Sequence, residues 1–507
     1  MKAFLMHRNR DFDLQQALLS DEQALTQDLA LNTLFNAMAL GDEFLFSVAH
    51  PAVLAASSDI DTILYRQDIL KDCLANSSVI REIYQITIDS VEDKQRRWYS
   101  IFGSSPGSIL HSSVGMMKMF VGLLAKLKYI ADEHACQFHS EGFTKFFSMI
   151  KRELNDEYFS SIQEHLDELE FRNGVLISAV LGRGNEGTDY ILRKSHGVKY
   201  GWLRRLFYWI RQVIIRKSNA CTFFIHPRDI NGSRALTELN DRGINLVANA
   251  IAQSADHIDN FFKMLRVELS FYIGCLNLHE KLMLIGEPVS YPQPFAVGTS
   301  RYSFKDLYDI CLALNMKQRI VGNDANADNK DLAIITGANQ GGKSTFLRSV
   351  GLAQLMMQCG MFVPAELFRC SVCDGLFTHF KREEDASMTR GKLDEELARM
   401  SNIADSLTSN SMVLFNESFA ATNEREGSEI ARQIAGALLE KHVKVFFVTH
   451  LYEFAHGFYN SMLDNVIFLR ADRQSDGKRT FKLHEGEPLQ TSYGEDLYIR
   501  VFGAAEQ

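Results

Sequence analysis

Two hydrophobic patterns divide the chain. Over residues 1–287, Leu, Met, Phe and Ile recur at three- and four-residue spacing, which is the period of an amphipathic helix. Helices are predicted at 25–40 and 155–170, and apolar positions from Ile258 to Leu276 alternate at four and three. The clearest strand signal in this part is 174–181. We therefore predict a long helical region over residues 1–287.

The pattern changes after three prolines between Pro288 and Pro294. Downstream, short apolar runs at 332–335, 412–415 and 443–448 alternate with helix-forming stretches. That alternation is typical of a parallel sheet flanked by helices. The predicted fold class is thus α + α/β, with the boundary after residue 287 and a mainly parallel sheet within 288–507.

Composition and charge argue against several classes of protein. The 507 residues are 46% hydrophobic, include only eight prolines and carry a net charge of -9, which argues against coating nucleic acid through bulk charge. Lys118 and Lys126 interrupt the apolar stretch at 116–127, and charges from His7 onward leave no signal-peptide core. We expect a cytoplasmic protein that has no membrane partner.

A glycine-rich loop follows the apolar run 332–335. The P-loop pattern is matched by Gly337-Ala338-Asn339-Gln340-Gly341-Gly342-Lys343-Ser344, and Thr345 continues into a helix-forming stretch. Glycines let backbone N–H groups turn toward phosphate oxygens, a lysine supplies charge to the β- and γ-phosphates, and a serine hydroxyl ligates magnesium. We predict that residues 337–345 bind ATP and that Ser344 is a ligand of Mg²⁺.

Two further strands end in candidate catalytic residues. Asn416-Glu417 follows the run 412–415, where a P-loop ATPase places its acidic pair, and Glu417 is the predicted general base or water-orienting group. Asn416 is the second predicted metal-site residue. It stands where an Asp usually helps to hold magnesium, and its amide brings no charge, so slow hydrolysis is expected. His450 ends the third strand at the same edge and is predicted to contact the γ-phosphate or the attacking water.

A basic and aromatic segment, 193–217, contains eight Lys or Arg residues and no acid. Its cations and aromatic rings could grip a phosphate backbone and stack on bases. A helix with inward aromatic rings, or an interfacial membrane helix, would have the same composition. The candidate DNA contacts are Lys199, Arg204, Arg205, Arg211, Arg216 and Lys217.

These motifs resemble those of the MutS-type DNA mismatch repair ATPases. The matching residues are Asn339, Gly341, Gly342, Glu417, Thr422, Gly427 and Thr449-His450, with Asn323-Asp324 and Ser492-Tyr493-Gly494 as further landmarks. The resemblance covers about residues 290–507. It implies an ABC-type ATPase domain, a homodimer with composite ATP sites, and DNA as the partner. It also makes the helical region similar to the family's core, lever and clamp, with 193–217 in the part that contacts DNA in relatives.

Two departures limit what the resemblance implies. The chain begins almost directly in the helical region and has no Phe-x-Glu in its first 100 residues, so reading of mismatched bases is not expected. Segment 388–397 lies where relatives carry a serine that reaches the partner subunit's γ-phosphate, and Ser387, Thr389 or Lys392 is the substitute here.

The favoured hypothesis is a MutS-like homodimer that hydrolyses ATP to switch a DNA clamp in repair or recombination. The alternative is a P-loop ATPase scaffold or nucleotide switch that acts on a protein partner without mismatch recognition.

Overall fold

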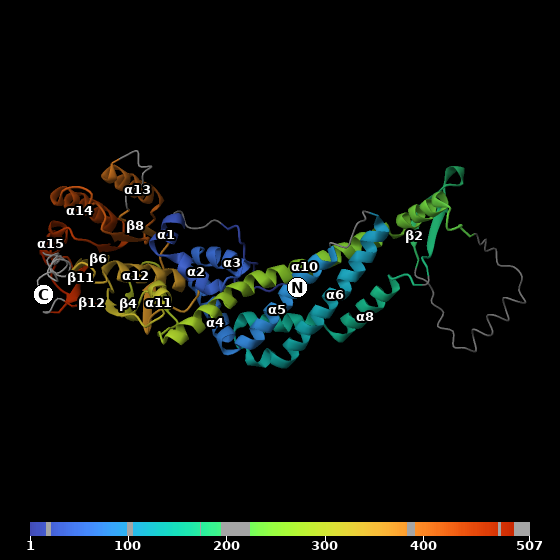
Figure 1. Cartoon of the computed structure of the whole chain (residues 1–507), viewed down its shortest axis with the longest axis horizontal. Helices are drawn as coiled ribbons and strands as arrows, with labels where there is room; N and C mark the ends of the chain where they lie inside the picture. Colours follow the sequence, from blue (N-terminus) through green and yellow to red (C-terminus); the bar gives the residue numbers. More distant parts are fainter. Residues whose placement is uncertain are drawn as a thin grey trace, which may run out of the picture. The chain divides into compact units, whose positions relative to one another are not determined.

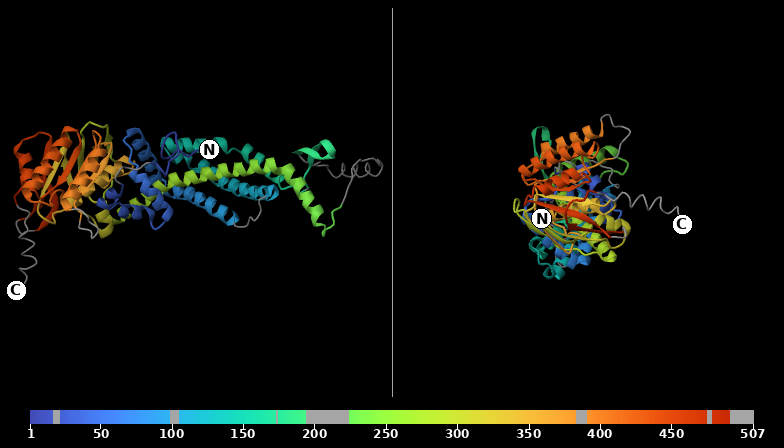
Figure 2. Two further views of the ribbon diagram at one scale, coloured as in Figure 1. Left: turned by 90° about the horizontal axis from the view of Figure 1, so that it is seen from above. Right: turned by 90° about the vertical axis from the view of Figure 1, so that its left-hand side faces the viewer.

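The structure is a computed structural model that describes residues 1–16, 22–98, 105–172, 174–193, 224–382, 391–474 and 478–490. The chain forms two compact units (Figures 1 and 2). The helical unit comprises Gln85–Glu133 and Phe147–Leu265, together with Met1. The sheet unit comprises Lys2–Tyr84, His134–Phe146 and Arg266–Gln507. The boundary predicted after residue 287 remains a prediction, and the last helix before it ends at Ile285.

The helical unit consists of long amphipathic helices and one antiparallel hairpin. Its elements are α5 (Ser77–Trp98), α6 (Pro106–His134), α7 (Glu141–Glu153), α8 (Asp156–Glu168), β1 (Ile177–Leu181), β2 (Gly187–Leu192) and α10 (Ile230–Ile285), of which α5, α6, α7 and α10 also contribute residues to the sheet unit. Phe120 of α6 stacks on Phe262 of α10, with ring centroids 6.0 Å apart. Lys94 of α5 pairs at 2.7 Å with Asp259 of α10, whose side chain is buried. The predicted three- and four-residue spacing thus marks the face of α10 that packs against its neighbours.

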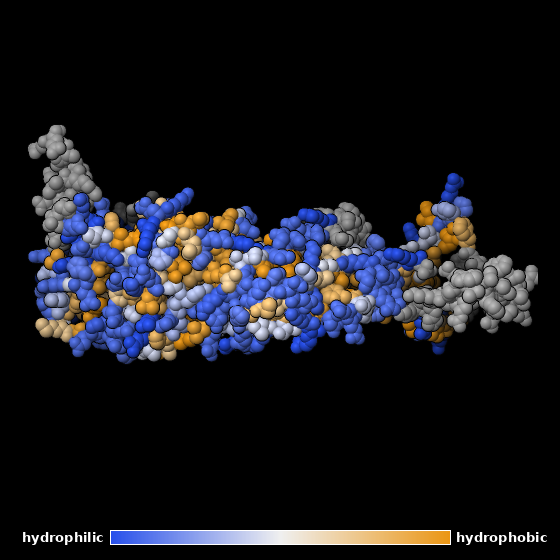
Figure 3. All heavy atoms as spheres, turned by 90° about the horizontal axis from the view of Figure 1, so that it is seen from below, coloured by the Kyte–Doolittle hydropathy of each residue, from blue (hydrophilic) through white to orange (hydrophobic). Residues whose placement is uncertain are grey.

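Helix α6 is more apolar than the sequence pattern suggested. Among the described residues, it is the one helix whose length and composition would allow it to cross a bilayer, and 44% of its most apolar window is buried inside the protein. Lys118 in its middle pairs with Asp167 of α8 at 3.4 Å and with Glu170. On the face displayed in Figure 3, hydrophilic side chains are interspersed with apolar ones. The absence of a membrane partner remains a prediction.

The sheet unit begins with four helices: α1 (Glu22–Asp28), α2 (Leu31–Ala39), α3 (Glu43–Leu54) and α4 (Ile60–Ala75). The predicted helix at 25–40 is divided into α1 and α2 because Ala30 has a left-handed backbone, with φ of 54°. The remaining elements are β3 (Gln293–Phe295), β4 (Tyr302–Leu307), α11 (Ile310–Met316), β5 (Asn323–Asn326), β6 (Leu332–Gly337), α12 (Lys343–Gln358), β7 (Leu367–Ser371), β8 (Leu376–Phe380), α13 (Lys392–Ser406), β9 (Met412–Asn416), α14 (Glu424–Glu440), β10 (Lys444–Val448), α15 (Tyr452–Asn460), β11 (Val466–Arg473) and β12 (Arg479–Glu485).

The strands form two sheets. The larger has the order β12-β11-β6-β10-β9-β8, in which β11, β6, β10, β9 and β8 are parallel and β12 is antiparallel. The smaller has the order β3-β7-β4-β5, with β4 antiparallel to both of its neighbours. The predicted mixed fold with a mostly parallel sheet is confirmed, and the runs 332–335, 412–415 and 443–448 are its strands β6, β9 and β10.

Helix α12 is buried between the two sheets. It contacts β6, β9 and β10 of the larger sheet and β4 of the smaller one. Alternate residues of β10 face opposite sides, as the period of a strand requires. Phe446 contacts Tyr302 of β4, whereas Phe447 packs against Phe415 and against Phe454 of α15. The larger sheet therefore has helix α12 on one face and helices α14 and α15 on the other.

A buried acid fixes the short helix α11 to α12. Asp309 caps α11 by accepting a hydrogen bond from the Leu312 N–H at 3.1 Å, and it accepts another from Arg348 Nε of α12 at 2.5 Å. Burial raises the pKa of the Asp309 carboxyl, and the neighbouring Arg348 guanidinium counteracts that rise. The pair holds α11 beside the first turns of α12.

We predict that Asp309→Ala destabilises the protein by about 2–3 kcal/mol, because it removes a helix cap and leaves Arg348 without its buried carboxylate. The measurement is the urea midpoint of unfolding. The matched control is Asp68→Ala, whose pair with Lys71 is exposed and whose loss should cost less than about 0.5 kcal/mol. Equal midpoints for the two variants would contradict this role of Asp309.

Candidate functional site

Three parallel strands bring the sequence motifs to one edge of the larger sheet. Within the ladder, Val448 of β10 lies opposite Ile335 of β6 on one side and Asn416 of β9 on the other. The Thr449 N–H donates to the Ile335 carbonyl at 3.0 Å, and the Glu417 N–H donates to the Val448 carbonyl at 2.9 Å. The P-loop, Asn416-Glu417 and His450 therefore follow the carboxyl ends of adjacent strands. Such edges are where ligands bind in open α/β sheets.

The loop between β6 and α12 has the backbone of a phosphate-binding turn. Gly337 and Gly342 have φ of 110° and 89°, and Gln340 also has a left-handed φ of 58°. A Cβ on Gly337 would lie 2.8 Å from the Ala471 backbone nitrogen, and one on Gly341 would lie 2.8 Å from the Ala471 side chain. Glycine is thus required both by conformation and by close packing against β11. Gly342 is the N-cap of α12, whose first N–H groups lie next to the loop.

Lys343 is a buried cation held by carbonyl oxygens. Its Nζ donates to the Gly337 and Ala338 carbonyls, each at 3.0 Å, and its side chain lines the neighbouring pocket. Burial lowers the pKa of Lys343 from 10.5 to about 8, opposed by the nearby negative charge of Glu417. A bound anion would strongly stabilise a buried ammonium group of this kind, because the carbonyls that surround it supply only partial negative charges.

Ser344 and Asn416 are joined across the sheet edge. The Ser344 hydroxyl donates to Asn416 Oδ1 at 2.8 Å. Both oxygen atoms are hard ligands of the kind that magnesium prefers, either directly or through water. The two predicted metal-site residues are thus adjacent, although the described residues include no group of three or more His, Cys, Asp or Glu side chains that could hold a metal ion.

Glu417 and His450 form a second pair. His450 Nε2 lies 2.9 Å from Glu417 Oε1, and this hydrogen bond is the main cause that lowers the pKa of the Glu417 carboxyl. An ionised carboxylate only accepts hydrogen bonds, so Nε2 carries the hydrogen. Glu417 itself has φ of 54°, a left-handed backbone that turns the chain sharply at the end of β9. The pair holds an ionised carboxylate at the sheet edge beside Lys343.

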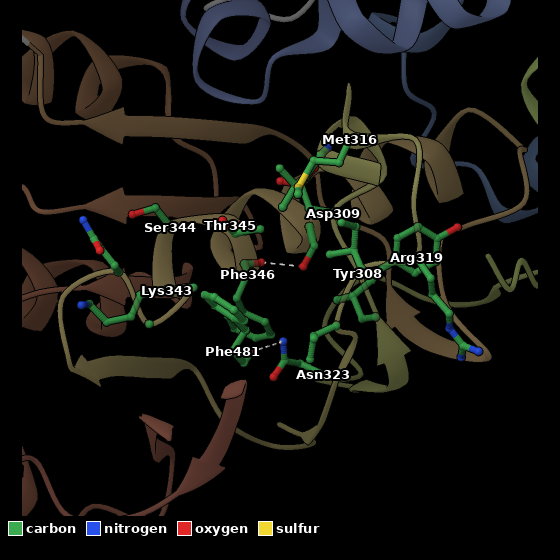
Figure 4. A pocket seen from close by; sticks show the side chains of 18 of the residues that line it. Tyr308, Asp309, Met316, Arg319, Asn323, Lys343, Ser344, Thr345, Phe346 and Phe481 are labelled. Atoms are coloured by element: carbon green, nitrogen blue, oxygen red, sulfur yellow. Dashed lines mark hydrogen bonds between the residues drawn. The ribbon is translucent and has the colours of Figure 1, made fainter. Parts of the chain in front are cut away.

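A pocket of about 460 Å³ opens beside these residues (Figure 4). The predicted residues among its lining are Asn339, Gln340, Gly341, Gly342, Lys343, Ser344, Thr345 and Glu417. The rest of the lining is largely apolar and includes Tyr308, Leu312, Met316, Ile320, Val321 and Phe481, of which Phe481 lies next to Gly342. Asn323 joins β5 to β12 at the pocket, because its Nδ2 donates to the Phe481 carbonyl at 3.3 Å and its Oδ1 accepts from the Leu483 N–H at 2.7 Å.

The sequence reasoning missed this apolar wall. Its residues come from α11, the loops on either side of it and β12, which are distant in the chain and carry no motif. The one available signal was Asn323, part of the Asn323-Asp324 landmark.

Ala338 is fully buried at the start of the loop, and Asn339 accepts at its carbonyl from Arg479 Nε at 3.2 Å.

Several predicted residues lie outside the part of the chain that the structure describes. They are Lys199, Arg204, Arg205, Arg211, Arg216, Lys217, Ser387 and Thr389, together with Ser492-Tyr493-Gly494. Arg193, at the start of the basic segment, is described, and its Nε donates to Ser178 Oγ at 2.9 Å. Lys392 is the first residue of α13. The DNA contacts and the substitute for the signature serine remain predictions.

Comparisons with known proteins match both parts of the chain. Residues 58–285 match the MutS2 N-terminal domain, and residues 333–498 match MutS domain V. The DNA mismatch repair protein MutS of Leptospira interrogans is 28% identical over 43% of this chain and 27% of its own length. Those of Syntrophomonas wolfei and Thermotoga maritima are 32% and 39% identical over 37% and 27% of this chain, which are 22% and 17% of their own lengths. The matched region thus spans about a quarter or less of these relatives.

The lowered pKa of Lys343 predicts a pH dependence of phosphate binding. In the free protein Lys343 loses its proton near pH 8, whereas bound phosphate oxygens would stabilise the charged form. ATP binding should therefore take up a proton above pH 8, and affinity should fall about tenfold per pH unit there. Calorimetry at pH 7 and pH 9, in buffers with different ionisation heats, measures both the proton uptake and the affinity for ATP. Lys343→Met should bind more weakly and lose the dependence. Equal wild-type affinities at the two pH values would contradict the prediction.

Proposed function

Because the chain belongs to the MutS-related family, we propose that it binds ATP with Mg²⁺ at this sheet edge, hydrolyses it slowly, and uses the nucleotide to switch its hold on DNA. The observation that carries the proposal is the convergence of three adjacent strand ends. They place a buried lysine, a serine–asparagine pair and a glutamate–histidine pair at one edge of the sheet, beside a 460 Å³ pocket.

The P-loop residues bind the phosphates. Lys343, which donates to the Gly337 and Ala338 carbonyls, supplies the positive charge that the β- and γ-phosphate oxygens need. The first N–H groups of α12 add the partial charge of a helix N-terminus. The apolar wall with Tyr308 and Phe481 accommodates the base. These features fit a nucleoside triphosphate.

Ser344 and Asn416 provide oxygen ligands for the metal, and Glu417 provides a carboxylate at the same edge. Magnesium, when bound, would neutralise phosphate charge as the γ-phosphate departs. Asn416 contributes no negative charge, so we expect weaker metal binding and slower turnover than an aspartate would give.

Glu417 orients or deprotonates the attacking water. Its carboxylate is ionised, because the hydrogen bond from His450 lowers its pKa, and an ionised carboxylate accepts a hydrogen from water. His450 donates its Nε2 hydrogen to the carboxylate and so fixes its position at the edge where the γ-phosphate would lie. A nucleotide that approaches this edge would meet both groups together.

DNA as the partner is proposed from the relatives and the sequence. The matched relatives are named DNA mismatch repair proteins, and the basic segment 193–217 supplies a candidate contact surface. A homodimer with composite ATP sites is proposed on the same grounds. Repair or recombination would be the process served.

A second candidate is a nucleotide switch that acts on a protein partner with negligible hydrolysis. The neutral amide of Asn416, bonded directly to Ser344, favours it. In this case ATP binding alone would change the state of the protein, and Glu417 would not take part in chemistry.

The role of Glu417 is tested by single-turnover ATP cleavage. Glu417→Gln keeps the size of the side chain but cannot accept a proton, so cleavage should fall about 100-fold or more while ATP affinity stays within about twofold. Glu440→Gln, at the far end of α14, is the matched control. Equal rates for wild type and Glu417→Gln would remove Glu417 from the chemistry and favour the switch.

DNA binding is tested with homoduplex, mismatched and branched DNA across a salt series, with and without ATP. Replacing Arg204, Arg205 and Arg211 with Gln should weaken binding and reduce the salt slope by about 3, since each phosphate contact contributes about 0.9. The control replaces Lys71, Lys145 and Arg152, which are exposed and are not part of the segment 193–217. Absence of binding at low salt would sink the DNA proposal and leave a protein partner.

A further inference from the structure

The turn that follows β9 has an unusual backbone. Glu417 and Phe419 have φ of 54° and 62°, so two non-glycine residues in a span of three adopt the left-handed conformation. Such residues persist only where surrounding contacts determine the backbone. The pair of Glu417 with His450 restrains only the carboxylate, and the backbone of the turn needs a different support.

Buried hydrogen bonds supply this support from β8 and α13. The Phe419 N–H donates to Glu396 Oε2 of α13 at 2.7 Å. The Ser418 hydroxyl donates to the backbone oxygen of His379 of β8 at 2.6 Å, and its Oγ lies 2.7 Å from the His379 ring Nδ1. The His379 ring also stacks on Phe419, with centroids 5.2 Å apart. The two residues after Glu417 are thus fixed by side chains from two other elements.

The protonation state of His379 determines which of its ring nitrogens donates a hydrogen bond. Burial lowers the pKa of His379 to about 4, so the ring is neutral at pH 7 and carries one N–H. Nε2 lies 3.0 Å from the Glu396 backbone oxygen, which only accepts, so Nε2 carries the hydrogen and donates it to α13. His379 therefore bridges the turn to the backbone of α13.

None of these side chains reaches a substrate directly. His379 and Ser418 have no exposed surface, and Glu396 is 5% exposed. Close packing restricts the turn further, because a Cβ on Gly427 of α14 would lie only 2.4 Å from the Phe419 carbonyl oxygen. The network is therefore suited to hold the backbone rather than to react.

We infer that Ser418, His379 and Glu396 are positioning residues that hold Glu417 in its hydrolytic orientation and tie that orientation to α13. The inference rests on the proposed hydrolysis. α13 begins at Lys392, and its first turns belong to the segment 388–397, which is predicted to reach the partner subunit's nucleotide. A movement of α13 would move Glu396 and, through its hydrogen bond, the Phe419 N–H. The backbone of Glu417, which orients the water, would then move as well.

The test compares Ser418→Ala, Glu396→Ala and Glu396→Gln with wild type. Both alanine variants should lower kcat for ATP hydrolysis about 10- to 100-fold and leave KM within about twofold, because a small misplacement of Glu417 affects the chemical step. Glu396→Gln keeps an oxygen that accepts from the Phe419 N–H, so its kcat should stay close to that of wild type. The matched control is Ser411→Ala, a buried serine at the other end of β9 that accepts from the Thr408 N–H at 3.1 Å.

A second readout does not depend on hydrolysis. The imidazole NMR signal of His450, which is bonded to Glu417, should shift in Ser418→Ala and stay unchanged in Ser411→Ala. An unchanged kcat and an unchanged His450 signal in Ser418→Ala would overturn the inference. It would also be overturned if Ser411→Ala lost as much kcat and as much melting temperature as Ser418→Ala. Absence of hydrolysis in wild type, with a His450 shift in Ser418→Ala, would instead refute the proposed function and retain the positioning role.

Discussion

The pairing of β6, β10 and β9 in parallel register is the constraint on which the candidate site depends. Because Val448 lies level with both Ile335 and Asn416, the residues that follow the three strands emerge together at one edge. A slip of one residue in either pairing would turn the strand's buried side chains to the other face and separate the motifs. The aromatic contacts on both faces of β10 oppose such a slip. The fold of the sheet unit and the geometry of the site are therefore specified by the same packing.

Charge at this edge is arranged around an anion. Lys343 is buried and donates to two carbonyls, and Glu417 keeps its negative charge chiefly through the hydrogen bond from His450, with a smaller contribution from the charge of Lys343. The hydrogen bond between Ser344 and Asn416 holds two further oxygen atoms nearby. Binding of phosphate and metal would replace weak dipolar contacts with full charges. The free energy of the site would therefore differ strongly between the nucleotide-bound and the nucleotide-free protein. A mechanism in which the nucleotide switches the protein requires such a difference.

The sequence predicted the strands and the glycine-rich turn that carry the candidate site better than their surroundings. Strands β6, β9 and β10 and the P-loop were recognised because alternating strands and helices have distinct periods, and because a phosphate-binding loop needs glycines at fixed positions. The apolar wall around Met316 and Phe481 was missed because its residues meet only through tertiary packing. The network of His379, Ser418 and Glu396 was missed for the same reason, since hydrogen bonds between β8, β9 and α13 leave no local pattern. The break at Ala30 depends on a left-handed backbone that alanine does not signal.

The most direct measurement of the central claim is a crystal structure with magnesium and a non-hydrolysable ATP analogue. The account predicts that the triphosphate lies over residues 337–345, and that Lys343 Nζ leaves the Gly337 and Ala338 carbonyls for phosphate oxygens. It also predicts that the Ser344 hydroxyl turns from Asn416 to the metal, and that Glu417 faces the γ-phosphate. A nucleotide bound elsewhere, or a Lys343 that keeps both carbonyl contacts beside the bound nucleotide, would contradict it.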